Sequence, residues 1–126
     1  MAARVLLIED NQDFRDIMAL VLKGAGYQLS MAVDGQEGLE TARREKPDLI
    51  VTDLMLPKLN GYEICTMLKQ DVRYRAIPIV VLSATKVEGK DIELARECGA
   101  NAFLVKTTAH QDLLKKIQEL LAPAKS

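Results

Sequence analysis

Residues 49–53 read Leu-Ile-Val-Thr-Asp, an apolar run rich in β-branched side chains that stops at a carboxylate. Three more apolar runs also stop at reactive side chains: 5–8 at Glu9 and Asp10, 79–82 at Ser83, and 103–105 at Lys106. Apolar runs without polar alternation are typical of strands buried on both faces, which belong to parallel sheets covered by helices. We therefore expect all four runs to be strands of one parallel sheet.

Helical patterns and helix-ending residues separate these runs along the chain. Asn11 can cap a first helix that Gly24 ends, and Pro47 and Gly99 close two later helices. A helix over 84–98 has few apolar contacts, mainly Ile92, Leu94 and Ala95, so we expect it to be weakly anchored. The strands are then expected at 5–8, 27–33, 48–52, 79–82 and 102–105. This alternation predicts an α/β fold: a doubly wound five-stranded parallel sheet in a three-layer α/β/α sandwich.

Size and charge restrict the possible functions. The 126 residues fit one domain, and 17 lysines and arginines nearly balance 18 aspartates and glutamates. No broad basic field is therefore present to bind nucleic acid or an anionic membrane. Residues 1–4 lead into a short apolar segment that resembles neither a signal peptide nor a membrane span, so we expect a cytoplasmic location. Cys65 and Cys98 have no CxxC spacing and are expected to act as small hydrophobic side chains.

The strand ends predict a charged site. All carboxyl ends of a parallel sheet lie on one edge, where open α/β sheets bind ligands. Two of the carboxylates of Glu9, Asp10 and Asp53, if about 5 Å apart at an effective dielectric near 20, would repel each other by roughly 3 kcal/mol. Lys106 supplies one compensating charge, and a hard divalent cation with oxygen ligands, Mg²⁺ above all, would supply two more. The pattern therefore indicates phosphoryl chemistry.

Asp53 is the preferred nucleophile of this site. A carboxylate can attack phosphorus and carry the phosphoryl group as an acyl phosphate. Asp53 follows the central strand and opens a loop, whereas Glu9 and Asp10 are adjacent where a cation needs ligands. Lys106 and the Ser83 hydroxyl could neutralise and bind the transferring oxygens.

The ordered set of motifs resembles the receiver domain of bacterial two-component response regulators over essentially the whole chain. The matching motifs are Glu9-Asp10, Asp53 with its Asp-Leu-Met-Leu-Pro-x-x-x-Gly tail, Ser83-Ala84, and Lys106 preceded by Phe103. The resemblance implies a flavodoxin-like, chemotaxis-regulator-like fold with strand order 2-1-3-4-5. It further implies a receiver over residues 1–122, followed by a tail or truncated linker over 123–126.

The same resemblance implies a role for each site residue. Asp53 would be the phosphoacceptor, with Asp10, Asp53 and the Met55 carbonyl as Mg²⁺ ligands and Glu9 acting mainly through water. Lys106 and Ala84 would bind the phosphoryl group, Ser83 would turn toward it, and Phe103 would swing inward. In this family, a histidine kinase or histidine phosphotransfer protein donates the phosphoryl group. A downstream effector protein or fused output domain then reads the face formed by the fourth helix, the fifth strand and the fifth helix.

The chain departs from the family pattern at three positions. Thr107 stands where proline is most common, so a cis Lys106–Thr107 bond is not implied. Phe103 replaces the frequent tyrosine. Met55 and Thr85 flank the path of attacking water in the family, and apolar Met55 is expected to slow or alter hydrolysis.

Other interpretations remain open for single residues. Taken alone, Asp10 could be a helix cap, Asp53 a turn residue and Lys106 a surface side chain, and their joint placement is what favours a site. We expect a signalling switch, not an enzyme beyond its own phosphorylation and dephosphorylation. The alternative is a receiver-like interaction domain that is not phosphorylated. A phosphatase or nucleotide hydrolase lacks its motifs, and the oligomeric state is expected to be a monomer or weak homodimer.

Overall fold

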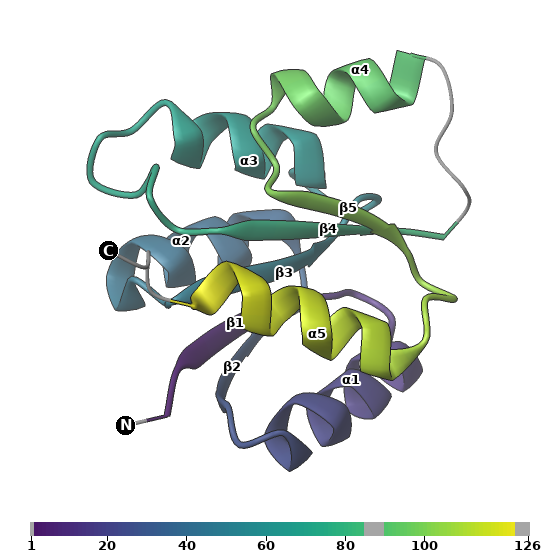
Figure 1. Cartoon of the computed structure of the whole chain (residues 1–126). Helices are drawn as coiled ribbons and strands as arrows, with labels where there is room; N and C mark the ends of the chain where they lie inside the picture. The colour runs from purple at the N-terminus through teal and green to yellow at the C-terminus, as the bar shows by residue number, and fades with distance from the viewer. Residues whose placement is uncertain (1, 85–89, 123–126) are drawn as a thin grey trace.

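Strands and helices alternate strictly along the chain (Figure 1). The computed structural model describes residues 2–84 and 90–122. Its strands are β1 (Arg4–Ile8), β2 (Gln28–Ala32), β3 (Leu49–Asp53), β4 (Ile79–Ser83) and β5 (Ala102–Val105). Its helices are α1 (Gln12–Gly24), α2 (Gly35–Glu45), α3 (Gly61–Lys69), α4 (Lys90–Glu97) and α5 (His110–Leu121). Two expected segments lie outside the described residues: the tail at 123–126, and residues 85–89 of the expected fourth helix, which include Thr85.

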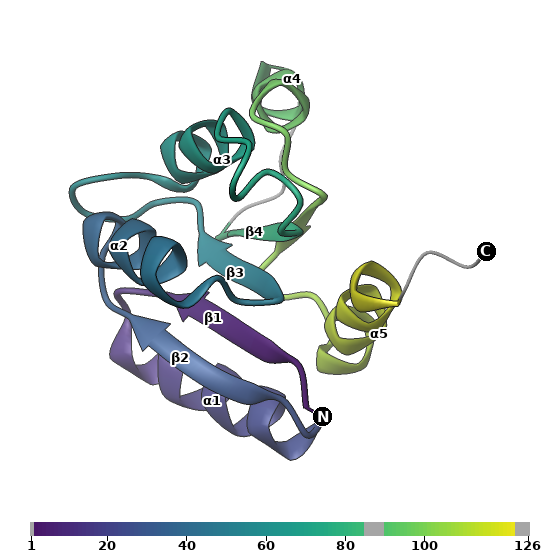
Figure 2. The same ribbon diagram turned by 90° about the vertical axis from the view of Figure 1, so that its left-hand side faces the viewer.

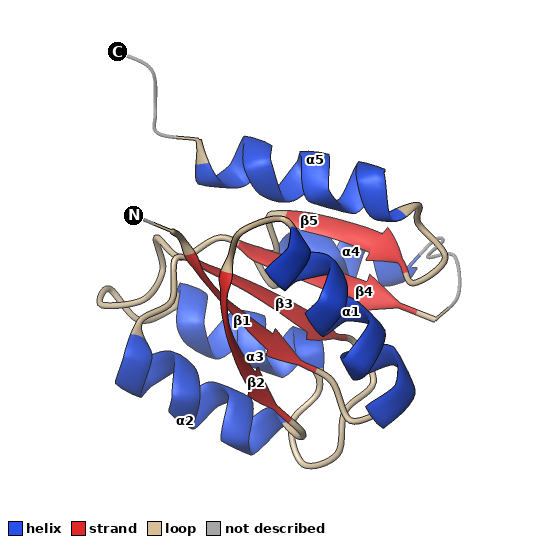
Figure 3. Cartoon of the chain, turned by 90° about the horizontal axis from the view of Figure 1, so that it is seen from below, coloured by secondary structure: helices blue, strands red, loops and turns tan. Residues whose placement is uncertain are grey.

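The sheet is parallel throughout, with strand order β2-β1-β3-β4-β5. Helices α1 and α5 cover one face, and α2, α3 and α4 cover the other (Figures 2 and 3). The chain therefore has the predicted flavodoxin-like, doubly wound α/β fold. None of the helices in the described ranges has the length and apolar character needed to span a bilayer.

The core has two halves, one on each face of the sheet. Alternate side chains of β1 divide between them: Leu6 and Ile8 pack with α2 and α3, and Val5 and Leu7 pack with α1 and α5. The central strands β3 and β4 are buried along their whole length, as two-sided burial predicts. The expectation was wrong for β5, whose residues are all only partly buried. It is an edge strand, with a neighbour on one side alone.

Side-chain caps set the starts of three helices. Asn11, Asp34 and Asn60 each accept a hydrogen bond from the backbone N–H three residues later, at the starts of α1, α2 and α3. Because Asn11 is the cap of α1, Asp10 is not needed for that role and its carboxylate is left for the site. Asn60 and Glu63 complete a capping box, which fixes the end of the loop that follows β3.

One expected contact of α4 is absent. Leu94 was predicted to anchor this helix, but its side chain is 45% exposed. The side chains of Ile92 and Ala95 lie outside the described part of the structure. Cys98, which directly follows α4, is buried and joins the core half beneath α3.

Candidate functional site

The predicted site residues meet at one edge of the sheet. In the register of β1 and β3, Asp53 is level with the residue that follows β1, which is Glu9. Ser83 is the last residue of β4, and Lys106 directly follows β5. Parallel pairing thus brings together side chains that are up to about a hundred positions apart in the sequence, as the strand endings predicted.

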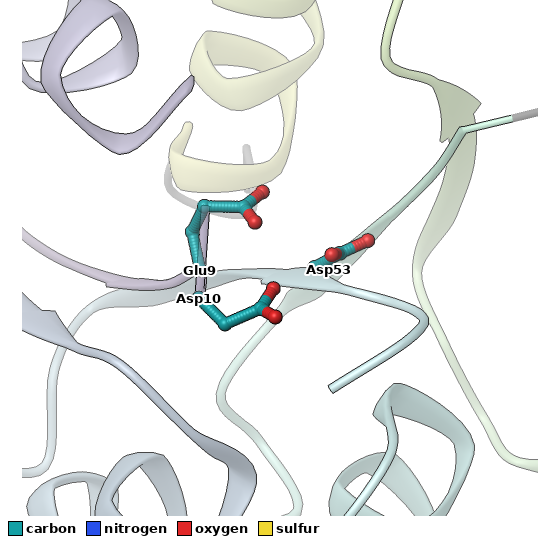
Figure 4. Close-up of side chains that lie close together, drawn as sticks. All are labelled: Glu9, Asp10 and Asp53. Atoms are coloured by element: carbon teal, nitrogen blue, oxygen red, sulfur yellow. The ribbon is translucent and has the colours of Figure 1, made fainter. Parts of the chain in front are cut away.

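Three carboxylates form the centre of this edge (Figure 4). Among the described residues, Glu9, Asp10 and Asp53 each offer an oxygen, and these oxygens lie within 4.8 Å of one another. Glu9 and Asp53 are 1% and 6% exposed, whereas Asp10 is exposed to solvent. The cluster is therefore open on the side of Asp10 and closed on the side of Glu9.

Lys106 contacts two of the three acids. Its Nζ lies 2.8 Å from Glu9 Oε1 and 3.2 Å from Asp53 Oδ2, and it stands over the ring of Phe14, 4.5 Å from the ring centroid. Burial lowers the pKa of the Lys106 ammonium, but the Glu9 hydrogen bond and the Asp53 charge outweigh it, so the pKa is raised overall. Lys106 is accordingly a fixed positive charge at the site.

Glu9 is held from several directions. The Asn11 N–H donates to its Oε2 at 3.0 Å, and the Arg15 guanidinium donates to its backbone oxygen at 2.9 Å. Burial raises the pKa of this carboxyl, and Asp53 acts in the same direction, whereas the hydrogen bonds from Lys106 and Asn11 oppose the rise. Glu9 thus depends on its partners to stay ionised.

Ser83 ends β4, next to the end of β3 that carries Asp53, and Ala84 follows it. Ser83 is buried, and its backbone oxygen accepts the Lys106 N–H at 2.7 Å, which ties the end of β4 to the lysine. Ala84 is exposed immediately after it. The hydroxyl and the following backbone are therefore at the same edge as Asp53.

Phe103 lies on β5 and stacks on a neighbour from α3. The rings of Phe103 and Tyr62 are 6.0 Å apart between centroids, at an interplanar angle of 28°. Both rings are partly buried against the core half on the α3 side. Phe103 is therefore partly buried, and it contacts Tyr62, which the sequence did not suggest as its partner.

The loop after β3 forms the rim of the site. Met55 lies in this loop with its side chain 72% exposed. The loop is closed by two hydrogen bonds of 2.8 Å, from Leu54 N–H to Leu82 O and from Gly61 N–H to Leu54 O. A Cβ at Gly61 would lie only 2.8 Å from the Asp53 backbone oxygen, so the return of the loop requires glycine there.

The sequence did not point to Phe14, Arg15 and Tyr62 as neighbours of the site residues. All three lie in the first two turns of a helix that starts just after a strand end or site loop. That position was the available signal, because the N-terminal turns of these helices begin at the carboxyl edge of the sheet. No peptide bond between described residues is cis, so the Lys106–Thr107 bond is trans.

The fold and the site together define a doubly wound α/β domain with a cluster of acids and a lysine at its strand ends. The family model of the response regulator receiver domain matches residues 5–118. The chain belongs to this family of receiver domains of two-component systems.

Relatives and solved structures agree with this assignment. The DNA-binding response regulator MtrA of Mycolicibacterium paratuberculosis is 32% identical over 96% of this chain and 52% of its own length. The chain spans about half the length of the curated relatives it matches. A putative response regulator from Chloroflexus aurantiacus superimposes with a TM-score of 0.90 at 30% identity, covering 96% of this chain and 98% of that one.

A further solved structure is of a receiver domain that contains a metal ion. The receiver domain of a sensor histidine kinase from Pseudomonas aeruginosa, solved with a magnesium ion coordinated in its active site cleft, is 28% identical. It superimposes with a TM-score of 0.87, covering 96% of this chain and 98% of that one.

Proposed function

We propose that this chain accepts a phosphoryl group on Asp53 from the phosphohistidine of a sensor kinase or phosphotransfer protein, and so acts as a signalling switch. The observation that carries the proposal is the contact of Lys106 with both Glu9 and Asp53 beside the Asp10 carboxylate. A buried carboxylate with a fixed ammonium 3.2 Å away, at an edge open to solvent, can meet an incoming phosphoryl group.

The donor set suits Mg²⁺. Three carboxylates and one ammonium leave a formal charge of minus two, and all the clustered ligand atoms are oxygens, which hard divalent cations prefer. We assign Asp10, Asp53 and the Met55 carbonyl as ligands, with Glu9 acting mainly through water. The bound ion would neutralise charge on the phosphoryl oxygens, and the magnesium in the related Pseudomonas aeruginosa receiver supports this assignment.

The chain's own residues then carry out the transfer. An Asp53 carboxylate oxygen forms a bond to phosphorus as the phosphorus–nitrogen bond to histidine breaks, and the departing imidazole nitrogen keeps the electron pair and takes a proton from water. We assign Lys106 to neutralise the phosphoryl oxygens, and the Ser83 hydroxyl and the Ala84 N–H to bind them. The protein modifies only itself, so it is a switch with self-directed chemistry.

The switch follows from the added charge. Phosphorylation replaces one negative charge on Asp53 by about two and adds strong acceptors, which favours movement of Ser83 toward the group. Phe103 would then leave its half-buried position against Tyr62 and move inward. We assign the readout to α4, β5 and α5, because Phe103 lies on β5 and Ser83 leads toward α4.

The partners follow from this role. We infer a cytoplasmic receiver domain over residues 1–122, with 123–126 as a tail or linker, which exists as a monomer or weak homodimer. Its input partner is a phosphohistidine protein, and its output is an effector or a fused domain. The receiver itself has no basic field for nucleic acid, whereas MtrA is named a DNA-binding regulator as a whole protein.

The competing function is a receiver-like interaction domain that is never phosphorylated. Retention of the three acids, the serine and the lysine in one cluster favours the phosphorylated switch. Incubation with acetyl phosphate and Mg²⁺, followed by intact mass measurement, tests the choice. We expect a gain of one phosphoryl group that Asp53→Asn abolishes and His110→Ala, at the exposed start of α5, leaves unchanged. Absence of any gain in the native chain would favour the interaction domain.

A further inference from the structure

Two buried thiols lie together between α3 and the C-terminal end of α4, away from the acidic site. Cys65 is on α3 and Cys98 directly follows α4, and both belong to the core half beneath α3. Cys65 is fully buried and Cys98 is 5% exposed. The two side chains are hydrogen-bonded to each other. From the sequence we expected two separate small hydrophobic side chains, but the fold brings the two cysteines together.

The backbone around the pair is already closely packed. Lys69 lies one turn after Cys65 on α3, and Gly99 follows Cys98. A Cβ at Gly99, whose φ is +86°, would lie 2.9 Å from Lys69 Cγ. Lys69 Nζ is fixed by hydrogen bonds to the backbone oxygens of Ile77 at 2.8 Å and Arg75 at 3.1 Å. The segment that follows α4 therefore approaches α3 closely beside the two thiols.

The surroundings shift the pKa values of the two thiols in opposite directions. The Cys65 hydrogen bond, backbone N–H groups and the Lys69 charge lower the pKa of Cys98 to about 6, although burial opposes this. The hydrogen bond to Cys98 and burial raise the pKa of Cys65. Cys98 is also the less buried of the two, at 5% exposed against 0% for Cys65, so an oxidant meets Cys98 first. Thiolates are the reactive form of cysteine, and both features assign Cys98 as the nucleophile of the pair and Cys65 as the thiol that resolves it.

We propose that Cys65 and Cys98 are a redox couple that closes to a disulfide between α3 and the end of α4 when the protein meets a peroxide. The Cys98 thiolate attacks one peroxide oxygen, the oxygen–oxygen bond breaks, and the released hydroxide or alkoxide takes a proton. The Cys65 sulfur, after losing its proton to water, attacks the Cys98 sulfur, and hydroxide leaves and is protonated to water. The two thiols are oxidised by two electrons in total, and the peroxide is reduced.

Closure has a mechanical consequence. A disulfide holds its sulfurs about 2.05 Å apart, closer than a hydrogen-bonded pair of thiols. The C-terminal end of α4 is therefore drawn toward α3 and fixed there. An effect on partner binding at α4 would rest on the proposed signalling function, but formation of the disulfide does not.

The test uses the full reduced chain without phosphorylation. The chain is treated with hydrogen peroxide, free thiols are alkylated, and peptides are mapped before and after dithiothreitol. Peptide mapping is required because exposed methionines such as Met55 also gain oxygen. We expect an intramolecular link between the peptides of Cys65 and Cys98 that dithiothreitol releases. Chains linked to one another, oxidised Cys98 without the link, or two unreacted thiols would each overturn the proposal.

Single variants test the assigned roles. In Cys65→Ser, Cys98 should still be oxidised but without closure. In Cys98→Ser, Cys65 should react at least about tenfold more slowly than Cys98 does in Cys65→Ser, because its thiolate is disfavoured. Equal rates would contradict the assignment of nucleophile and resolving thiol. If either variant fails to fold, the peptide map of the native chain decides alone. Because this measurement does not involve Asp53, its failure would leave the phosphoacceptor proposal standing.

Discussion

The Lys106 ammonium lies closer to Glu9 than to Asp53, at 2.8 Å against 3.2 Å. Glu9 is also the more deeply buried of the two acids. Lys106 therefore compensates a buried carboxylate and also lies beside Asp53, the proposed phosphoacceptor. A phosphoryl group on Asp53 would compete with Glu9 for the same ammonium.

This pairing predicts a large cost for removing the lysine alone. Lys106→Met leaves the buried Glu9 carboxylate without its cation, so the pKa of Glu9 should rise further and the free energy of unfolding should fall by about 3 kcal/mol. The double variant with Glu9→Gln should recover much of this loss, since it removes the unpaired charge. Urea unfolding of the two single variants and the double variant measures the coupling. If the losses in free energy of unfolding of the two single variants simply add up in the double variant, Lys106 does not stabilise the fold by compensating the charge of Glu9.

Metal binding should stabilise the fold through the acids. At ten times its dissociation constant, Mg²⁺ should raise the free energy of unfolding by about 1.4 kcal/mol, and chelation should reverse the gain. Asp10→Asn removes one proposed ligand and should abolish most of the gain, while it raises stability in metal-free buffer by relieving repulsion. Thermal or urea unfolding with and without Mg²⁺ measures both effects. An equal Mg²⁺ gain in Asp10→Asn would place the ion elsewhere.

Met55 should slow loss of the phosphoryl group. Met55→Asn introduces a side chain that can hydrogen-bond an attacking water, and one such bond, worth about 1 kcal/mol, corresponds to roughly fivefold faster dephosphorylation. Decay of the phosphorylated protein, followed by mass spectrometry, gives the rate. Met67→Asn, at a partly exposed position late in α3, is the matched control and should leave the rate unchanged. An unchanged rate in Met55→Asn would refute the role given to Met55.

Gly61 should tolerate no side chain. In Gly61→Ala the added Cβ meets the Asp53 backbone oxygen, so the loop must shift at a cost of about 1–3 kcal/mol, and Asp53 should be phosphorylated more slowly. Gly24→Ala is the matched control, because no atom lies within 4 Å of its Cβ position at the end of α1. That control should be neutral or stabilising by up to about 1 kcal/mol. Equal effects of the two changes would rule out the steric explanation.

The sequence predicted the fold and the gathering of the site residues because both follow from local patterns and one rule of topology. The strand endings predicted that Asp53, Ser83 and Lys106 lie at one edge of the sheet, since the carboxyl ends of parallel strands share that edge. Burial of β5 was predicted wrongly because an apolar run does not reveal whether its strand has one neighbour or two. The expected burial of Leu94 was wrong for a similar reason, since apolar spacing does not tell which face of a helix meets the core.

Contacts between side chains of different elements could not be predicted. The preference of Lys106 for Glu9, the stacking of Phe103 on Tyr62 and the pairing of Cys65 with Cys98 all depend on how helices and strand ends pack. The spacing of residues along one sequence does not reveal the distances between side chains of different helices and strands.

The most direct test of the account is to locate the phosphoryl group on the chain. The protein is treated with acetyl phosphate and Mg²⁺, the acyl phosphate is reduced with borohydride, which converts a phosphorylated aspartate to homoserine, and the peptides are sequenced by mass spectrometry. We predict homoserine at position 53 alone. Homoserine at position 10, or a phosphorylated chain without homoserine at position 53, would contradict the assignment of Asp53 as the phosphoacceptor.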